Sequence, residues 1–226
     1  MRFTTIIFDL DHTLLDSDRS EELAFAHVLD SIDVDHPEQH LPVYQRINSA
    51  LWKKVEAGEL SPNEVKVERF VQLLDALDID ADPEALGEHY LEGLAENGEL
   101  YLGARSLLDS LSDLRLGLVT NGIGALQRRR LDRLELDNYF DGVVISGEVG
   151  VAKPDPTIFE HLNFCTWLPN ETVIVGDSLT SDIAAGANAG ISTCWYNPTA
   201  SPRSGPNSPT VEVDQLLDIP DALAHC

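Results

Sequence analysis

The stretch that decides the fold is TTIIFDLDHT, residues 4–13. Its first half is a short run of apolar and β-branched residues, which is typical of a strand. The run then gives way to acidic residues, and a single leucine separates Asp9 from Asp11. We therefore predict a strand over residues 4–10 that delivers two carboxylates at its carboxyl end.

Four more runs of this kind occur later in the chain, and helical patterns separate them. The runs cover residues 115–120, 142–146, 172–176 and 191–195. The helical patterns include the stripe Leu107, Leu108, Leu111 and Leu114 and a helix start at Asp155 and Pro156. This alternation favours an α/β fold with a Rossmann-like parallel sheet. Residues 197–210, rich in Pro, Ser and Gly, predict a surface loop before a last helix near residues 213–217.

One long segment, from about residue 20 to residue 97, contains no convincing strand. Ser61 and Glu64 have capping-box spacing with Pro62 in the first turn, and Asp82 followed by Pro83 marks another helix start. Helices this short are marginal alone, so we expect them to pack together beside the sheet. The predicted division is an α/β core of residues 1–16 and 98–226, with an all-helical cap of residues 17–97 inserted after the first strand.

The charge of the chain limits its partners. Fifteen Lys and Arg residues against 39 Asp and Glu residues give a formal net charge of −24. The negative electrostatic potential of such a chain repels polyanions, which argues against binding to nucleic acid or to an anionic membrane. We interpret the excess acid as a solvated surface, and a basic partner is the alternative. A phosphorylated substrate would need local cations.

Cysteine content and hydropathy favour a cytoplasmic protein. Cys165, Cys194 and Cys226 lie far apart, without the spacing of a disulfide framework or a zinc site. The chain has neither the pattern of a signal peptide at its start nor a long apolar segment. The sequence leaves the oligomeric state open.

Chemistry-bearing residues follow several of the predicted strands. Thr120 and Asn121 end the second strand and Asp177 follows the fourth, while Lys153 precedes the helix after the third. Asp182 lies on the helix that follows Asp177. Ligands of open parallel sheets bind outside the carboxyl ends of the strands, so we expect these side chains to meet there.

The pair Asp9 and Asp11 is the strongest candidate for metal binding. Neighbouring carboxylates repel, and they persist when they bind a cation or when one of them has a raised pKa. Oxygen ligands of this kind suit Mg²⁺, and Asp177 would complete the set. The alternative interpretation is a loop rich in aspartate because aspartate favours turns.

Four motifs carry a family resemblance. DLDHT (residues 9–13), TN (120–121), KP (153–154) and GDSLTSD (176–182) occur in this order. Together they resemble the haloacid dehalogenase superfamily, and the helical insert resembles its helical cap. The resemblance implies that Asp9 is the nucleophile and Asp11 the general acid and base. It further implies that Thr120 and Lys153 position phosphate, that Asp177 binds Mg²⁺ and that Asp182 supports the site.

These roles fit the chemistry of phosphoryl transfer, which needs a nucleophile, cations for the developing charge and a proton donor for the leaving group. Asp9 would form an aspartyl phosphate and Asp11 would protonate the leaving oxygen and then activate water. Dehalogenases of the superfamily lack the acid at the position of Asp11, so the resemblance favours a phosphatase. A phosphomutase and a non-catalytic binding protein stay open as alternatives.

The sequence is less direct about the substrate. Residues 48–52, 120–127, 147–154 and 194–197 are similar to bacterial pyrimidine 5′-nucleotidases of the superfamily. This similarity implies a nucleoside monophosphate, with a sugar phosphate or phosphoglycolate as the alternative. Asn121 would line the phosphate site. Trp52 would stack on the base, unless it is a core residue of the cap.

The run of Arg128, Arg129 and Arg130 could reach a phosphate. Three adjacent residues of a helix point to different faces, however. We therefore interpret these arginines as solvated partners of surface acids.

Overall fold

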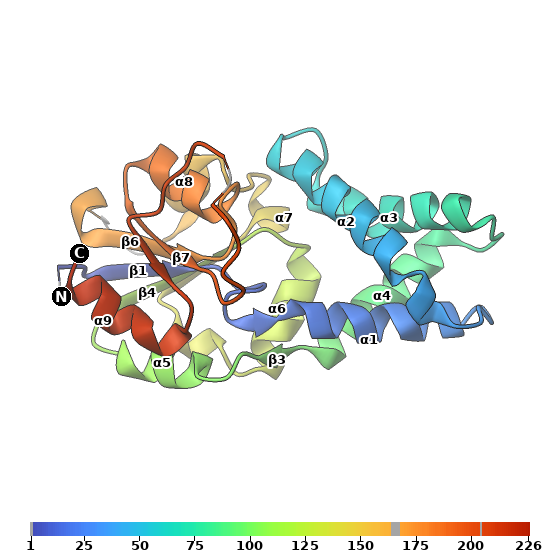
Figure 1. The fold of residues 1–226 in the computed structure, drawn as a ribbon, viewed down its shortest axis with the longest axis horizontal. Coiled ribbons are helices and arrows are strands. Elements are labelled where there is room, and N and C mark those ends of the chain that lie inside the picture. The colour runs from blue at the N-terminus through green and yellow to red at the C-terminus, as the bar shows by residue number, and fades with distance from the viewer. Residues whose placement is uncertain (1, 164–167, 204) are drawn as a thin grey trace.

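The computed structural model describes residues 2–163, 168–203 and 205–226, and it consists of a sheet layer beside a bundle of helices (Figure 1). The sheet is parallel throughout, with the order β5-β4-β1-β6-β7-β8. Its strands are β1 (Thr5–Phe8), β4 (Arg115–Thr120), β5 (Gly142–Ile145), β6 (Thr172–Gly176), β7 (Ser192–Tyr196) and β8 (Val211–Val213). The predicted α/β fold and its five strands are confirmed.

The sixth strand, β8, corrects the prediction for the C-terminal part. We expected a helix near residues 213–217, but Val213 ends a strand that pairs with β7. The 3-10 turn Leu216–Asp218 and the helix α9 (Ile219–Ala224) follow it. A strand of three residues is too short to show the alternation of apolar and polar residues that marks a strand in the sequence. Only its pairing with β7 identifies it as a strand.

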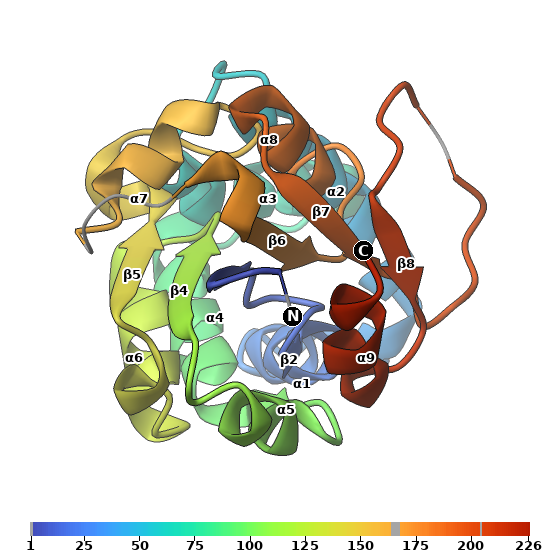
Figure 2. The same ribbon diagram turned by 90° about the vertical axis from the view of Figure 1, so that its left-hand side faces the viewer.

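Helices cover both faces of the sheet, as Figure 2 shows from one end. Ile6 and Phe8 point to one face, where they pack with α5 (Ala104–Ser110), α6 (Gly124–Arg133) and α9. Ile7 points to the other face, toward α8 (Asp182–Ala189) and the 3-10 segment Pro156–His161. Neighbouring residues of a strand point to opposite faces, so β1 is buried on both sides. β1 therefore lies in the middle of the sheet, and its carboxyl end is a topological switch point.

The helical bundle comprises α1 (Ser17–Asp30), α2 (Leu41–Glu56), α3 (Pro62–Leu77) and α4 (Pro83–Asn97). The capping box of Ser61 and Glu64 and the N-cap of Asp82 form as predicted. A cluster of buried rings fills its centre: Phe25, Tyr44, Phe70 and Tyr90. Helices of this length gain their stability from such packing.

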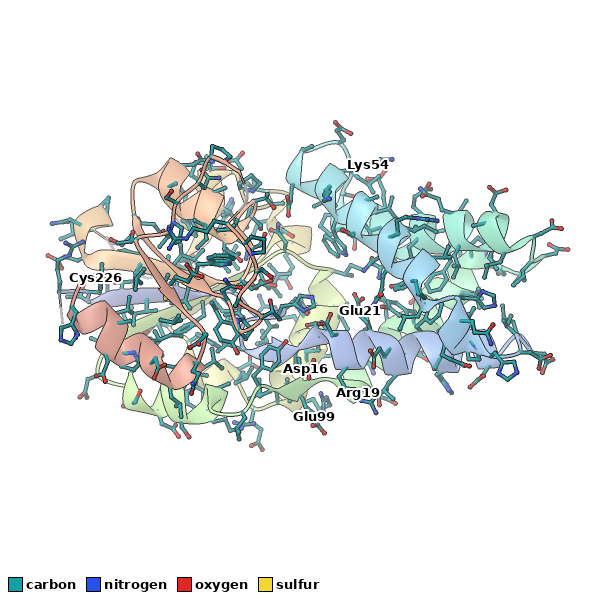
Figure 3. All side chains as sticks on the ribbon, viewed as in Figure 1. Asp16, Arg19, Glu21, Lys54, Glu99 and Cys226 are labelled. Atoms are coloured by element: carbon teal, nitrogen blue, oxygen red, sulfur yellow. The ribbon has the colours of Figure 1, made fainter. Side chains whose placement is uncertain are left out.

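A short antiparallel pair, β2 (Leu15–Asp16) and β3 (Glu99–Leu100), lies where the chain leaves the sheet layer and where it returns. Figure 3 labels Asp16 and Glu99 at this junction. The division of the chain at residues 17 and 97 stays a prediction. The remaining short elements are α7 (Ser146–Val149) and the 3-10 turns Pro37–Gln39, Asp137–Tyr139 and Pro169–Glu171.

Two further observations concern the chain as a whole. None of the helices in the described part is long and apolar enough to cross a bilayer. Cys194 is buried and Cys226 is exposed, each with a free thiol, while Cys165 lies outside the described residues.

The closest approach of α1 and α4 gives a test of the bundle. A Cβ atom on Gly93 would lie 2.9 Å from Cβ of Ala24. We expect Gly93→Val to lower the free energy of unfolding by about 1–3 kcal/mol, because overpacking forces the helices apart. The measurement is denaturant unfolding followed by circular dichroism. Glu92→Val, on the exposed side of the same helix, is the control and should change the value by about 0.5 kcal/mol or less. Equal stability of the two variants would contradict the close packing.

Candidate active site

Asp9 stands directly after β1, where the central strand ends. Its backbone N–H still donates to the carbonyl of Val175 at 2.9 Å, which fixes the residue against β6. The side chain is buried and both oxygens have donors. Nζ of Lys153 lies 2.5 Å from Oδ1, and the hydroxyl of Thr13 lies 3.4 Å from Oδ2. The carboxylate is therefore held in one orientation.

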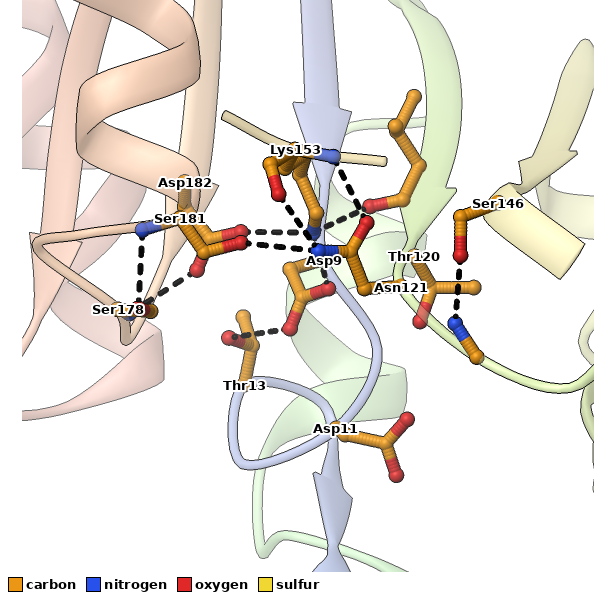
Figure 4. A network of polar contacts seen from close by, with 12 residues as sticks. Asp9, Asp11, Thr13, Thr120, Asn121, Ser146, Lys153, Ser178, Ser181 and Asp182 are labelled. Atoms are coloured by element: carbon orange, nitrogen blue, oxygen red, sulfur yellow. Dashed lines mark hydrogen bonds and ion pairs between the residues drawn. The ribbon is translucent and has the colours of Figure 1, made fainter. Parts of the chain in front are cut away.

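The ammonium group of Lys153 connects several parts of the site (Figure 4). Its side chain is only 1% exposed, and Nζ donates to Asp9, to Asp182 at 2.7 Å and to the carbonyl of Val119 at 2.7 Å. Three acceptors thus match the three protons of the ammonium group. Burial alone would lower the pKa of Lys153, but Asp182 and Asp9 raise it above its ordinary value, so the ammonium stays charged.

Asn121 positions the loop that carries Lys153. Its side-chain amide donates to the carbonyl of Lys153, and its side-chain oxygen accepts from the backbone N–H of Lys153, each at 2.9 Å. The pair of bonds ties the end of β4 to the segment after β5. We expected Asn121 to line the phosphate site, and the structure places it in the wall of the same cavity as Asp9.

Three carboxylates gather at this point. Oxygen atoms of Asp9, Asp177 and Asp182 all lie within 4.8 Å of one another. They face one ammonium, which leaves two negative charges unbalanced when all are ionised. Burial raises the pKa of Asp177 to about 8, with a further contribution from Asp182. Burial also raises the pKa of Asp9 well above its usual range, against the opposing effect of Lys153. This oxygen set could hold a divalent cation.

The position of Asp182 depends on the absence of a side chain at Gly176. A Cβ atom on Gly176 would lie 2.3 Å from Cγ of Asp182, so only glycine leaves room for the carboxylate. The second oxygen of Asp182 accepts from the backbone N–H of Ser178 at 3.0 Å. The supporting role that we predicted for Asp182 stays a prediction, and the structure places its oxygens beside those of Asp9 and Asp177.

Asp11 lies in a different environment, and its carboxylate points away from the cluster around Lys153 (Figure 4). It accepts from the hydroxyl of Ser17 at 2.5 Å, from the amide of Gln127 at 2.6 Å and from Nη1 of Arg130 at 2.8 Å. Burial alone would raise the pKa of Asp11, but Arg130 and the bonds from Ser17 and Gln127 lower it below its ordinary value. These donors come from α1 and α6, and our prediction of Asp11 as a metal ligand stays a prediction.

The interpretation of three solvated arginines is wrong for Arg130, which is 3% exposed. It is right for Arg128, which pairs with Glu148 at the surface, and Arg129 is exposed. Gln127 was missed as well. The two residues are three positions apart and share one face of α6. That spacing was a usable signal, but only the docking of the helical bundle shows that this face is buried.

A cavity of about 430 Å³ joins these groups to the helical bundle. This volume lies in the range of small-molecule sites. Its wall includes Asp9, Asp11, Lys153, Asp177 and Asp182 on the sheet side and Glu21, Asn48 and Trp52 on the bundle side. Trp52 is partly buried and packs against the core of the bundle, as the core interpretation expects. It also lines the cavity, and its stacking on a base stays a prediction.

Thr120 is fully buried at the end of β4. Its hydroxyl accepts a hydrogen bond from the amide of Gln127 at 3.0 Å. The same amide donates to Asp11, so Thr120 supports the residues that hold Asp11. Its predicted contact with phosphate stays a prediction.

Glu21 and Asn48 are site residues that sequence reasoning missed. The amide of Asn48 donates to Glu21 at 3.0 Å. The buried side-chain oxygen of Asn48 has no partner among the described residues. Asn48 lies in the segment of residues 48–52 that resembles the nucleotidases, but that resemblance assigned it no role, and Glu21 neither follows a strand nor belongs to a motif.

Comparison with known proteins finds relatives over nearly the whole chain. Residues 6–196 match the family described as haloacid dehalogenase-like hydrolase. The chain is 37% identical to the pyrimidine 5′-nucleotidase PynA of Streptococcus pneumoniae, over 99% of this chain and 96% of that protein. It is 34% identical to the pyrimidine 5′-nucleotidase YjjG of Escherichia coli, over 99% of both chains. The solved structure of the putative HAD-hydrolase YfnB of Bacillus subtilis, bound to magnesium, superimposes with a TM-score of 0.90 at 32% identity over 99% of both chains.

The contribution of the Lys153 ammonium to the free energy of unfolding can be tested. We expect Lys153→Met to lower the free energy of unfolding by about 3–5 kcal/mol, because the variant leaves two buried carboxylates without their counter-charge. The loss should be smaller near pH 5 than near pH 8, because protonation removes the buried charge and the stability returns as the pH falls. Chemical unfolding at both pH values is the measurement. Lys54→Met, on the exposed face of α2, is the control and should shift the value by about 0.5 kcal/mol or less. A pH-independent difference would contradict this account.

Proposed function

The chain belongs to the haloacid dehalogenase-like hydrolases and is a phosphatase, and we propose that it removes the 5′-phosphate of pyrimidine nucleotides with Mg²⁺ as its cofactor. In this proposal Asp9 attacks phosphorus and carries the phosphoryl group. Asp11 moves the protons. The product is a nucleoside and inorganic phosphate.

The observation that carries the proposal is the position of Asp9. It is a buried carboxylate at the end of the central strand, it opens into the cavity and Lys153 fixes one of its oxygens. Phosphoryl transfer needs a nucleophile placed in line and cations close to the oxygens on which charge develops. Lys153 supplies one such cation, and Asp11 lines the same cavity as a second acid.

The three clustered carboxylates support the cofactor. Asp9, Asp177 and Asp182 are the residues that would hold Mg²⁺, because their oxygens converge and their charges exceed that of Lys153. When bound, Mg²⁺ neutralises charge on the phosphate oxygens. The carboxylate of Asp11 already has three donors, so we assign it to proton transfer instead of metal binding.

The bundle side of the cavity supports a nucleoside as the leaving group. Trp52 offers a ring against which a base can stack, which is worth about 1–3 kcal/mol per base. Asn48 and Glu21 offer polar groups beside it. The two relatives named as pyrimidine 5′-nucleotidases align over nearly the whole chain, cap included.

Phosphate release tests the reaction. The purified protein should release phosphate from UMP, dTMP and CMP faster than from glucose 6-phosphate or phosphoglycolate. Asp9→Asn should lower the rate by about 10³-fold or more, because the nucleophile is lost. Asp35→Asn changes an exposed aspartate in a loop of the bundle and serves as the matched control. Unchanged turnover in Asp9→Asn would exclude the proposed nucleophile, and a preference for a sugar phosphate would exclude the nucleotide.

Metal binding has a separate readout. Magnesium should raise the melting temperature of the wild-type protein, since a ligand at about 100 times its Kd stabilises the folded state by about 2.7 kcal/mol. Asp177→Asn should lose most of this shift, while added sodium chloride at equal ionic strength should not reproduce it. Chelation by EDTA should abolish phosphate release, and excess Mg²⁺ should restore it. An equal thermal shift in Asp177→Asn would remove this residue from the metal site.

A further inference from the structure

The C-terminal end of α4 is capped by another helix. The last four carbonyls of an α-helix have no partner within the helix. At the end of α4, Nε of Arg130 donates to the carbonyl of Leu94 at 3.2 Å, and Nε of Arg133 donates to that of Ala95 at 2.7 Å. Arg133 also donates to the carbonyl of Gly98. Two guanidinium groups at the negative end of the helix dipole add a favourable charge interaction. These contacts join the helical bundle to α6 of the sheet layer.

Arg130 uses its other nitrogens inside the active site. Nη1 donates to Asp11 at 2.8 Å and to Gln127 at 3.2 Å, and Nη2 donates to the hydroxyl of Ser20 at 3.2 Å. One buried guanidinium therefore contacts α4, α1 and Asp11 together. Because the group is planar and rigid, its bonds to the bundle constrain the direction of its bond to Asp11.

Asp11 depends on these contacts for its position. Its three donors, Ser17, Gln127 and Arg130, come from α1 and α6. In Figure 4 its carboxylate points away from the cluster around Lys153. A general acid must lie within hydrogen-bond reach of the oxygen that it protonates. The way in which the helical bundle packs against α6 therefore affects the position from which Asp11 can donate a proton.

We propose that Arg130 is a positioning residue that acts through Asp11 and links proton transfer to the docking of the helical bundle. The inference rests on the proposed function. As the Asp9 oxygen bonds to phosphorus, the bond from phosphorus to the ester oxygen breaks and its electron pair goes to that oxygen. Asp11 enters this step protonated, its proton passes to the leaving oxygen, and Asp11 becomes the carboxylate that Arg130 holds in the structure. The water that then attacks the aspartyl phosphate gives a proton to Asp11, which restores the acid.

Leaving groups of different basicity separate this role from simple substrate binding. An alkoxide leaving group, as in UMP, needs a proton, whereas the nitrophenolate of p-nitrophenyl phosphate needs little help. We expect Arg130→Met to lower kcat/KM for UMP by about 10²-fold and for p-nitrophenyl phosphate by about threefold or less. Arg130→Lys keeps the positive charge but loses the planar arrangement of guanidinium donors. Its kcat/KM for UMP should therefore lie between those of the wild type and Arg130→Met. If another alkyl phosphate proves the better substrate, it replaces UMP in the comparison.

The control is Arg133→Met. Arg133 caps the same end of α4, and it donates to the carbonyls of Ala95 and Gly98 instead of to Asp11. This variant should lose stability and keep the wild-type ratio of the two kcat/KM values. In the background of Asp11→Asn, Arg130→Met should cost about threefold or less for UMP, because the residue through which it acts is already disabled.

Several results would overturn the inference. Equal losses on both substrates would show a direct role of Arg130 in phosphate binding. A full additional loss in the Asp11→Asn background, or a gain of activity in Arg130→Met, would exclude action through Asp11. Absence of phosphate release by the wild-type protein from either substrate would overturn the proposed function, and the inference with it.

Discussion

The buried ammonium of Lys153 is the interaction on which the site depends. Its three acceptors come from three places in the sheet layer: Asp9 after β1, the carbonyl of Val119 in β4 and Asp182 at the start of α8. Asn121 fixes the backbone of Lys153 from a fourth direction. A buried ion group of this kind is favourable only when every donor and acceptor is satisfied. The site therefore forms only when the central strands of the sheet have paired as they do in the folded protein.

The two acids of the first motif are only two residues apart, yet the fold separates them. Burial raises the pKa of Asp9 beside other carboxylates, while Arg130, against the effect of burial, lowers that of Asp11. The turn after β1 produces this difference, because it directs Asp9 into the sheet layer and Asp11 toward α1 and α6. Two chemically identical groups therefore have different surroundings: Asp9 lies beside Lys153 and two further carboxylates, and Asp11 lies beside Arg130, Ser17 and Gln127.

Topology explains which parts of the site the sequence could predict. Asp9, Lys153 and Asp177 each follow a strand, and the carboxyl ends of parallel strands share one edge, so strand prediction alone brings them together. Arg130 and Gln127 lie on a face of α6 that is buried against Thr120, Asp11 and the end of α4. Glu21 and Asn48 depend on how α1 and α2 pack. No local pattern encodes these contacts between distant segments, which is also why β8 was missed.

A strongly acidic chain that acts on an anion must attract it locally. The net charge of −24 repels phosphate at long range, but salt screens exposed charges beyond about 8–10 Å. The cations that line the cavity, Lys153, Arg130 and Arg69, are buried, so solvent screens them much less. Each of these cations is held by protein acceptors, however. A phosphate that binds beside Lys153 and Arg130 must therefore share these cations with the carboxylates that already pair with them.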